Sequence, residues 1–135
     1  MISIDQIRRR VREYGEIINA PLNLINIPDK PIGDGSPHVE ITESLYNYVI
    51  SERGIEHTRR QTKKIDDLLY WIFSDIASAM SFDYELKNRI SDRDCRRLAF
   101  DHRLRLLGKL NKSWKEREAA KIRLALEESP YVDSK

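Results

Sequence analysis

The chain of 135 residues has the length of one ordinary domain, which buries roughly two-thirds of the surface of its unfolded chain. Its 40% hydrophobic and 34% charged residues exclude a disordered or collagen-like protein, and no apolar run is long enough to span a membrane. A formal net charge of +2 is too small to draw the whole molecule onto a phosphate backbone. We therefore expect one domain over residues 1–135.

The first predicted element is an amphipathic helix that begins at a capping box of Ser3 and Gln6 and ends before Pro21. Gly15 lies inside its apolar pattern and predicts a close contact with another segment or a bend. The residues from Pro21 to Pro37 are rich in proline and glycine, so we expect a connection that lies partly against the core.

After Pro37 the hydrophobic period changes to two, which predicts an antiparallel meander of three strands. Glu43-Ser44 is a poor pair for a tight hairpin because such turns need positive φ, so we expect the first turn to be longer. Arg53-Gly54 fits the second turn better.

From Thr62 onward the pattern is helical. Thr62 is the expected cap of a long core helix, Ser91 with Asp94 opens the next helix, and Ser113 with Glu116 opens the last. Strands that are separated from helices along the chain predict an α+β fold, with an N-terminal helix, the meander, and three C-terminal helices packed on the sheet.

Motifs of catalytic and cofactor sites are missing from the sequence, so we expect neither enzymatic activity nor a cofactor. Three scattered histidines, His38, His57 and His102, are a weak basis for a metal site. Cys95 lies on the apolar side of its predicted helix, which favours a buried residue over a nucleophile. As the single cysteine, without a secretory signal before it, it predicts a reducing cytoplasm.

The densest polar cluster of the predicted sheet has seven candidate partner-binding residues, which are Glu52, Arg53, Glu56, Arg59, Arg60 and the neighbouring Tyr46 and Tyr48. In a regular strand Glu56 and Arg60 share one face, as do His57 and Arg59, so acids and guanidinium groups are placed to pair across the strands. Two interpretations stay open, a structural ion-pair network and a partner-contacting edge.

A second cluster is the arginine-rich helix over residues 93–105. Helical spacing aligns Arg93, Arg97 and Arg105 in a stripe that could face phosphates, but Asp101 on the same stripe favours internal pairing. A solvated face is the favoured interpretation, and a nucleic-acid-binding regulator is the alternative. Tyr70, Trp71 and Trp114 are expected in the core or at its edge.

The order of the motifs resembles the immunity protein 63 family of bacterial polymorphic toxin systems. The residues that carry the resemblance are Tyr14-Gly15, Ala20-Pro21, Tyr46-x-Tyr48, Glu52-Arg53-Gly54-x-Glu56, Arg59-Arg60, Leu68-Leu69-Tyr70-Trp71-Ile72-Phe73, Tyr84-Glu85, Arg89, Arg96-Arg97, Phe100, Leu106-Leu107, Trp114 and Pro130-Tyr131-x-Asp133. One departure is Ile27-Pro28, where the family pattern has Leu-Pro.

The resemblance implies a small cytoplasmic protein that binds a cognate toxin domain and protects the producing cell, without being an enzyme. It names neither the toxin nor the contact surface, and the oligomeric state stays open.

A third hypothesis is an enzyme whose site around Glu56 and His57 assembles only in space. Because the residues before Thr62 carry eight basic and nine acidic side chains, we expect no capture of the partner by global charge attraction.

Overall fold

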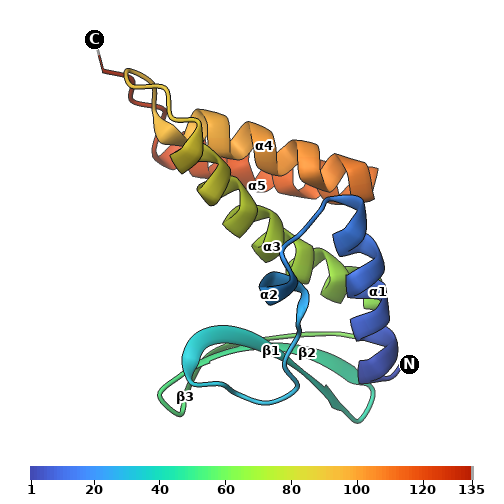
Figure 1. Ribbon diagram of the computed structural model, residues 1–135. Coiled ribbons are helices and arrows are strands. Elements are labelled where there is room, and N and C mark those ends of the chain that lie inside the picture. The colour runs from blue at the N-terminus through green and yellow to red at the C-terminus, as the bar shows by residue number, and fades with distance from the viewer. Residues whose placement is uncertain (135) are drawn as a thin grey trace. The chain divides into compact units, whose positions relative to one another are not determined.

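The computed structural model describes residues 1–134 and confirms the predicted α+β fold, with one additional short helix (Figure 1). An N-terminal helix precedes a three-stranded antiparallel sheet in the order β1-β2-β3, and the long helices follow. The strands are β1 Asp34–Thr42, β2 Leu45–Glu52 and β3 Ile55–Thr62.

Helix α1 (Ile4–Ile17) begins at the predicted capping box. The Gln6 amide donates to Ser3 Oγ at 3.2 Å, and the Ser3 amide donates to Gln6 Oε1 at 2.8 Å. The close contact predicted at Gly15 is made by Ile25 of the short helix α2 (Leu22–Ile25), because a Cβ on Gly15 would lie 2.8 Å from Ile25 Cγ2. Helix α2 was missed because four residues are too few to show a helical period.

Two expectations about the sheet are wrong. Thr42 pairs with Leu45, so Glu43 and Ser44 alone make the first turn, and Glu43 takes the positive φ of 49° that we expected the chain to avoid. The cost of a left-handed non-glycine residue, about 1 kcal/mol, is evidently tolerated here. In addition, β1 begins at Asp34, before Pro37 rather than after it, with an irregular register that accommodates the missing proline amide.

The long helices are α3 (Ile65–Lys87), α4 (Cys95–Leu110) and α5 (Lys112–Glu128). The predicted starts of the last two are wrong by a few residues. Asp94 rather than Ser91 caps α4, accepting the Arg96 amide at 2.9 Å, and Asn111 rather than Ser113 caps α5, accepting the Trp114 amide at 3.1 Å. In both cases the residue that precedes the first helical turn supplies the cap.

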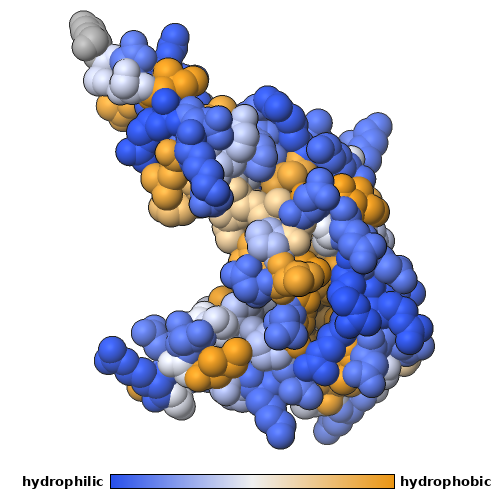
Figure 2. All heavy atoms as spheres, in the orientation of Figure 1, coloured by the Kyte–Doolittle hydropathy of each residue, from blue (hydrophilic) through white to orange (hydrophobic). Residues whose placement is uncertain are grey.

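The chain divides into two compact units, and the division between Ile72 and Phe73 falls inside α3. The core of the amino-terminal unit is formed by Ile7, Val11, Val39, Tyr46, Tyr48, Val49, Leu68, Leu69 and Ile72, and that of the other unit by Phe73, Ile76, Ala77, Leu106, Leu107, Trp114 and Ile122. Hydrophilic residues cover most of the surface visible in Figure 2, and hydrophobic ones show as separate patches. Among the described residues, no helix combines the length and the apolar character that a membrane span requires.

Candidate partner-binding surface

The predicted turn between β2 and β3 has the geometry of a tight hairpin. Glu52 pairs with Ile55, and the two residues between them, Arg53 and Gly54, have φ values of 53° and 78°. Positive φ at both central positions matches the right-handed twist of the flanking strands, so the chain reverses its direction in two residues. All four residues are exposed, and the Glu52 side chain retains 51% of its accessible surface.

Beyond the turn, β3 carries a β-bulge that changes which residues share a face. Ser51 pairs with Glu56, but Ile50 pairs with Thr58, so His57 is the extra residue. The expectation that Glu56 shares a face with Arg60 is therefore wrong, because the bulge places Glu56 beside Arg59 instead. The Arg59 Nη2 atom donates to Glu56 Oε1 at 2.8 Å.

Arg59 also reaches across the sheet, which confirms that acids and guanidinium groups pair between strands. Its Nη1 atom lies 3.3 Å from Glu40 Oε1 on β1. Glu40 in turn contacts His38, whose Nε2 atom lies 2.6 Å from Glu40 Oε2 and whose side chain is 1% exposed. One polar network thus links β1 to β3 over the middle strand.

The network holds its carboxylates in the ionised form. The hydrogen bond with His38 is the main cause that lowers the pKa of Glu40, and the hydrogen bonds from Arg59 lower the pKa of Glu56. The pKa of Arg59 is raised, mainly by its hydrogen bonds to Glu56. These three side chains are committed to one another, so their first role is to hold the strand in place.

Two of the predicted partner-binding residues are not on the surface. Tyr46 and Tyr48 are 2% and 3% exposed, so the prediction that they touch a partner needs correction. The Tyr46 hydroxyl accepts the Ile2 amide at 2.9 Å, and the Tyr48 ring stacks on Trp71 of α3 with centroids 6.5 Å apart. Their side chains point to the face of the sheet that the helices cover, where aromatic area stabilises the core.

Arg60 lies on the same face as Tyr48 but stays exposed. Its guanidinium group lies 5.8 Å from the centre of the Trp71 ring, which is a cation–π contact. The structure therefore leaves five of the predicted residues exposed on the hairpin, with Arg60 on the opposite face of the sheet from Glu56 and Arg59; the other two are Glu52 and Arg53.

The second cluster is neutralised by carboxylates, and it does not form the predicted helical stripe. Arg97 and Arg105 lie on α4, whereas Arg93 lies in the loop before it. Arg97 Nη2 lies 2.9 Å and Arg93 Nη1 lies 3.6 Å from Asp133 Oδ2, while Arg105 pairs with Asp101 at 2.6 Å. This confirms the internal pairing that the spacing of Asp101 and Arg105 indicates. A cation that already contacts a carboxylate contributes little to attraction of a phosphate backbone.

The residues from Ser129 to Ser134 lie along the start of α4. Asp133 Oδ1 accepts the Asp94 amide at 2.8 Å, and Asp94 Oδ2 accepts the Val132 amide at 2.9 Å. The Tyr131 ring lies against two guanidinium groups, at 4.2 Å from that of Arg97 and 5.5 Å from that of Arg96. This segment, rather than a ligand, occupies the cationic end of α4.

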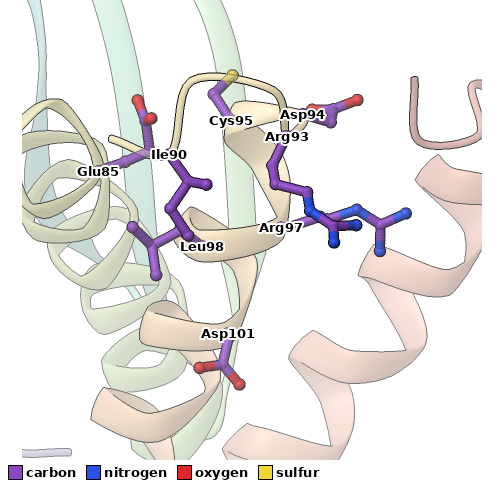
Figure 3. Close-up of a pocket in the computed structure, with 8 residues that line it drawn as sticks. All are labelled: Glu85, Ile90, Arg93, Asp94, Cys95, Arg97, Leu98 and Asp101. Atoms are coloured by element: carbon purple, nitrogen blue, oxygen red, sulfur yellow. The ribbon is translucent and has the colours of Figure 1, made fainter. Parts of the chain in front are cut away.

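A surface pocket of about 280 Å³ opens beside that end of α4 (Figure 3). Figure 3 shows Ile90 and Leu98 projecting toward the same space, with the Arg93 and Arg97 guanidinium groups on the other side. Cys95 lines the pocket and is exposed, so the expectation of a buried cysteine is wrong. The reason is that Cys95 is the first residue of α4 rather than part of its interior.

The pocket gives no grounds for catalytic chemistry. Its buried carboxylate, Glu85, is 2.9 Å from Arg89 Nη2, and this hydrogen-bonded contact lowers the pKa of Glu85. A lower pKa makes the group a poorer general base. The described residues also contain no group of three or more His, Cys, Asp or Glu side chains arranged to hold a metal ion.

Sequence reasoning missed the roles of three residues that shape these surfaces. His38 and Glu40 are two positions apart in β1, so a period of two already places them on one face, and this signal was available. Asp133 had no such signal, since its partners Arg93 and Arg97 are more than thirty residues away and lie on a different element.

The fold and this surface define a small α+β protein with a tight, charged hairpin and no recognisable catalytic centre among its described residues. The immunity protein 63 family matches residues 43–124, which is more than half of the chain, and the chain belongs to this family. The match spans β2, β3, α3, α4 and most of α5. No curated protein and no solved structure matches the chain.

Proposed function

We propose that the protein neutralises a cognate bacterial toxin domain by binding it, without catalysing a reaction. The observation that carries the proposal is the family match over residues 43–124, because proteins of this family are immunity proteins. The protein would act in the cytoplasm of the cell that makes the toxin. A stable complex of this kind covers about 800 Å² on each partner.

The contact surface that we propose is the exposed part of the β2–β3 hairpin, with Glu52, Arg53 and Arg60 as the contacting side chains. The hairpin lies inside the family match, and its tight turn has positive φ at Arg53 and Gly54. A hairpin that is already folded loses less conformational entropy on binding than a disordered loop does. Glu56 and Arg59 support this surface, because they pair with each other and Arg59 also pairs with Glu40.

The nucleic-acid alternative has no specific observation in its favour. Arg93, Arg97 and Arg105 each contact a carboxylate, and the net charge of the chain is only +2. We therefore propose no second function.

The direct test is co-expression with the toxin domain encoded beside its gene. We expect the cells to survive and the two proteins to purify as a complex, and continued killing without a complex would overturn the proposed function. A charge swap of Glu52→Arg with Arg53→Glu keeps the net charge and should abolish protection. The matched control is Asp101→Arg with Arg105→Asp on α4, which also keeps the net charge and should protect like the wild type.

A further inference from the structure

The two edges of the sheet differ in whether their backbone is occupied. At the β1 edge, the Val39 amide donates to the Pro28 carbonyl at 2.9 Å, so the connection before β1 runs along that strand. Strand β3 has only β2 beside it, and seven of its eight residues are exposed (Figure 1). An edge strand of this length presents free donors and acceptors.

The register shows which backbone groups of β3 face outward. Val39 pairs with Tyr48, and because the Val39 amide donates to Pro28 it points away from β2. In such a pair both residues direct their backbone groups away from each other, so those of Tyr48 point to β3. There Tyr48 pairs with Arg60, whose backbone groups point back to β2. Because the direction alternates along a strand, the amides and carbonyls of Arg59 and Gln61 point away from the sheet. In the described part of the chain these four groups have no hydrogen-bond partner.

Side-chain contacts on both faces hold this edge in position. On one face Arg59 is bound by Glu40 and Glu56, and Gln61 Nε2 donates to Asn47 Oδ1 at 2.8 Å. On the other face Arg60 lies over the Trp71 ring. The strand is therefore extended and ordered before any partner arrives, which lowers the entropic cost of pairing with another strand.

The charges along this edge select the kind of partner. Arg60, Lys63 and Lys64 are exposed cations, and the sequence from His57 to Ile65 contains no acidic residue. A second copy of the chain, paired antiparallel about Arg60, would place the two Arg60 side chains directly opposite each other, which is destabilising. An extended segment with acidic side chains fits the same edge without that repulsion.

We propose that the β3 edge binds an extended, acidic segment of the toxin domain as a fourth strand, through the backbone of Arg59 and Gln61. This inference rests on the proposed function and specifies its binding mode. The charged turn at Arg53 then lies at one end of the added strand, so both contacts belong to one continuous surface.

The test compares two substitutions at one position by their affinity for the purified, catalytically inactive toxin domain encoded beside the gene. Gln61→Pro removes an outward amide without breaking the bonds between β2 and β3, and edge strands tolerate proline there. We expect Gln61→Pro to weaken binding by about tenfold or more, and Gln61→Ala, which keeps the amide, to weaken it no more than about threefold.

A second pair of variants tests the charge and does not depend on the folding of the proline variant. Lys63→Glu with Lys64→Glu should weaken binding by about tenfold, while Arg9→Glu with Arg10→Glu on the exposed side of α1 changes the net charge equally and should not. In the wild-type complex, hydrogen exchange at the Arg59 and Gln61 amides should slow markedly.

The outcomes separate the two proposals. Absence of any complex with the wild type overturns the proposed function and this inference with it. A complex whose affinity is the same for all variants, with no added protection at Arg59 and Gln61, overturns this inference and leaves the proposed function standing. A third outcome is a concentration-dependent dimer that Gln61→Pro dissociates, while toxin binding is unchanged. This result would identify a second copy of the chain as the partner of the β3 edge and would also overturn the inference.

Discussion

Two glycines inside helices have different surroundings, and alanine should therefore have opposite effects at the two positions. Alanine at Gly15 would place a methyl group 2.8 Å from Ile25 Cγ2, which a branched side chain cannot vacate easily. The overpacking cost of about 1–3 kcal/mol should exceed the gain in helix propensity of about 1 kcal/mol. We expect Gly15→Ala to lower the free energy of unfolding in a urea titration.

Gly108→Ala is the matched control. Its methyl group would meet only the flexible Lys115 side chain, whose Cδ lies 3.0 Å away and can move. We expect this variant to gain up to about 1 kcal/mol of stability from helix propensity. Equal changes in the free energy of unfolding for the two substitutions would show that the contact with Ile25 does not determine the effect at Gly15.

Asp94 makes the stability of the protein depend on acid pH. The hydrogen bonds from Arg96, and then those from backbone amides, hold its pKa well below its ordinary value of 3.8. The ionised carboxylate therefore stabilises the fold above about pH 4, and this contribution is lost as the pH falls below that value. We expect Asp94→Asn to lower the melting temperature at pH 7 and to reduce its further decrease on acidification.

The exposed Asp92→Asn variant, which makes the same change of charge in the same loop, is the control for Asp94. It should melt like the wild type across the pH range. A parallel decrease of both variants would indicate a general effect of charge rather than the contacts of Asp94.

The environments of some single residues could be predicted and those of others could not. The difference is whether they depend on neighbours in the sequence or on distant segments of the chain. The capping box at Ser3 and the contact at Gly15 follow from local pattern, and both are confirmed. The burial of Tyr46 and Tyr48 depends on which face of the sheet the helices cover. Residues 46–49 of the middle strand β2 are all buried, so both of its faces are covered there, and alternation along one strand does not predict this.

At the scale of elements, a buried ion pair ties the three long helices together. Glu118 of α5 is fully buried, and its Oε2 atom lies 3.2 Å from Arg103 Nε on α4. Its Oε1 atom accepts from Ser74 Oγ on α3 at 2.9 Å. Such a pair need not stabilise the fold more than apolar residues would, but removal of one partner leaves a buried charge.

We expect Glu118→Leu alone to lower the free energy of unfolding by about 3 kcal/mol, because Arg103 then lacks its carboxylate. The double variant with Arg103→Met should recover most of this loss, since it removes both charges. Urea titrations of the two single variants and the double variant measure the coupling. Additive losses would contradict the expected role of the pair.

The types and order of the elements could be predicted because long periodic segments carry a strong signal. Their ends could not, because several residues near each end qualify as caps and tertiary contacts choose among them. Asp94 caps α4 instead of Ser91 because it also binds the segment around Val132. The bulge at His57 likewise has no mark in the sequence, although it decides that Arg59 pairs with Glu56.

At the scale of the whole molecule, we propose that the two compact units unfold as one domain. The division between Ile72 and Phe73 lies inside the continuous helix α3, whose buried residues contribute to both cores. Because a continuous helix transmits the loss of one core to the other, a single cooperative transition should result.

Each unit contains one tryptophan, which provides the measurement. Trp71 lies in the amino-terminal unit and Trp114 in the other. Trp114→Phe leaves Trp71 as the reporter, and Trp71→Phe leaves Trp114. In each variant the midpoint from fluorescence should coincide with the midpoint from circular dichroism, whereas two separate midpoints would show independent units.

The backbone conformation of the two hairpin turns determines which residue types are favourable at Glu43 and Arg53. Glu43 and Arg53 have φ values of 49° and 53°, a region in which glycine and asparagine lie more easily. Selection for stability alone should therefore replace both residues with glycine or asparagine over many generations. If relatives retain a long charged side chain at the position of Arg53 but not at that of Glu43, the retained side chain serves recognition, and the turn bears its conformational strain for that purpose.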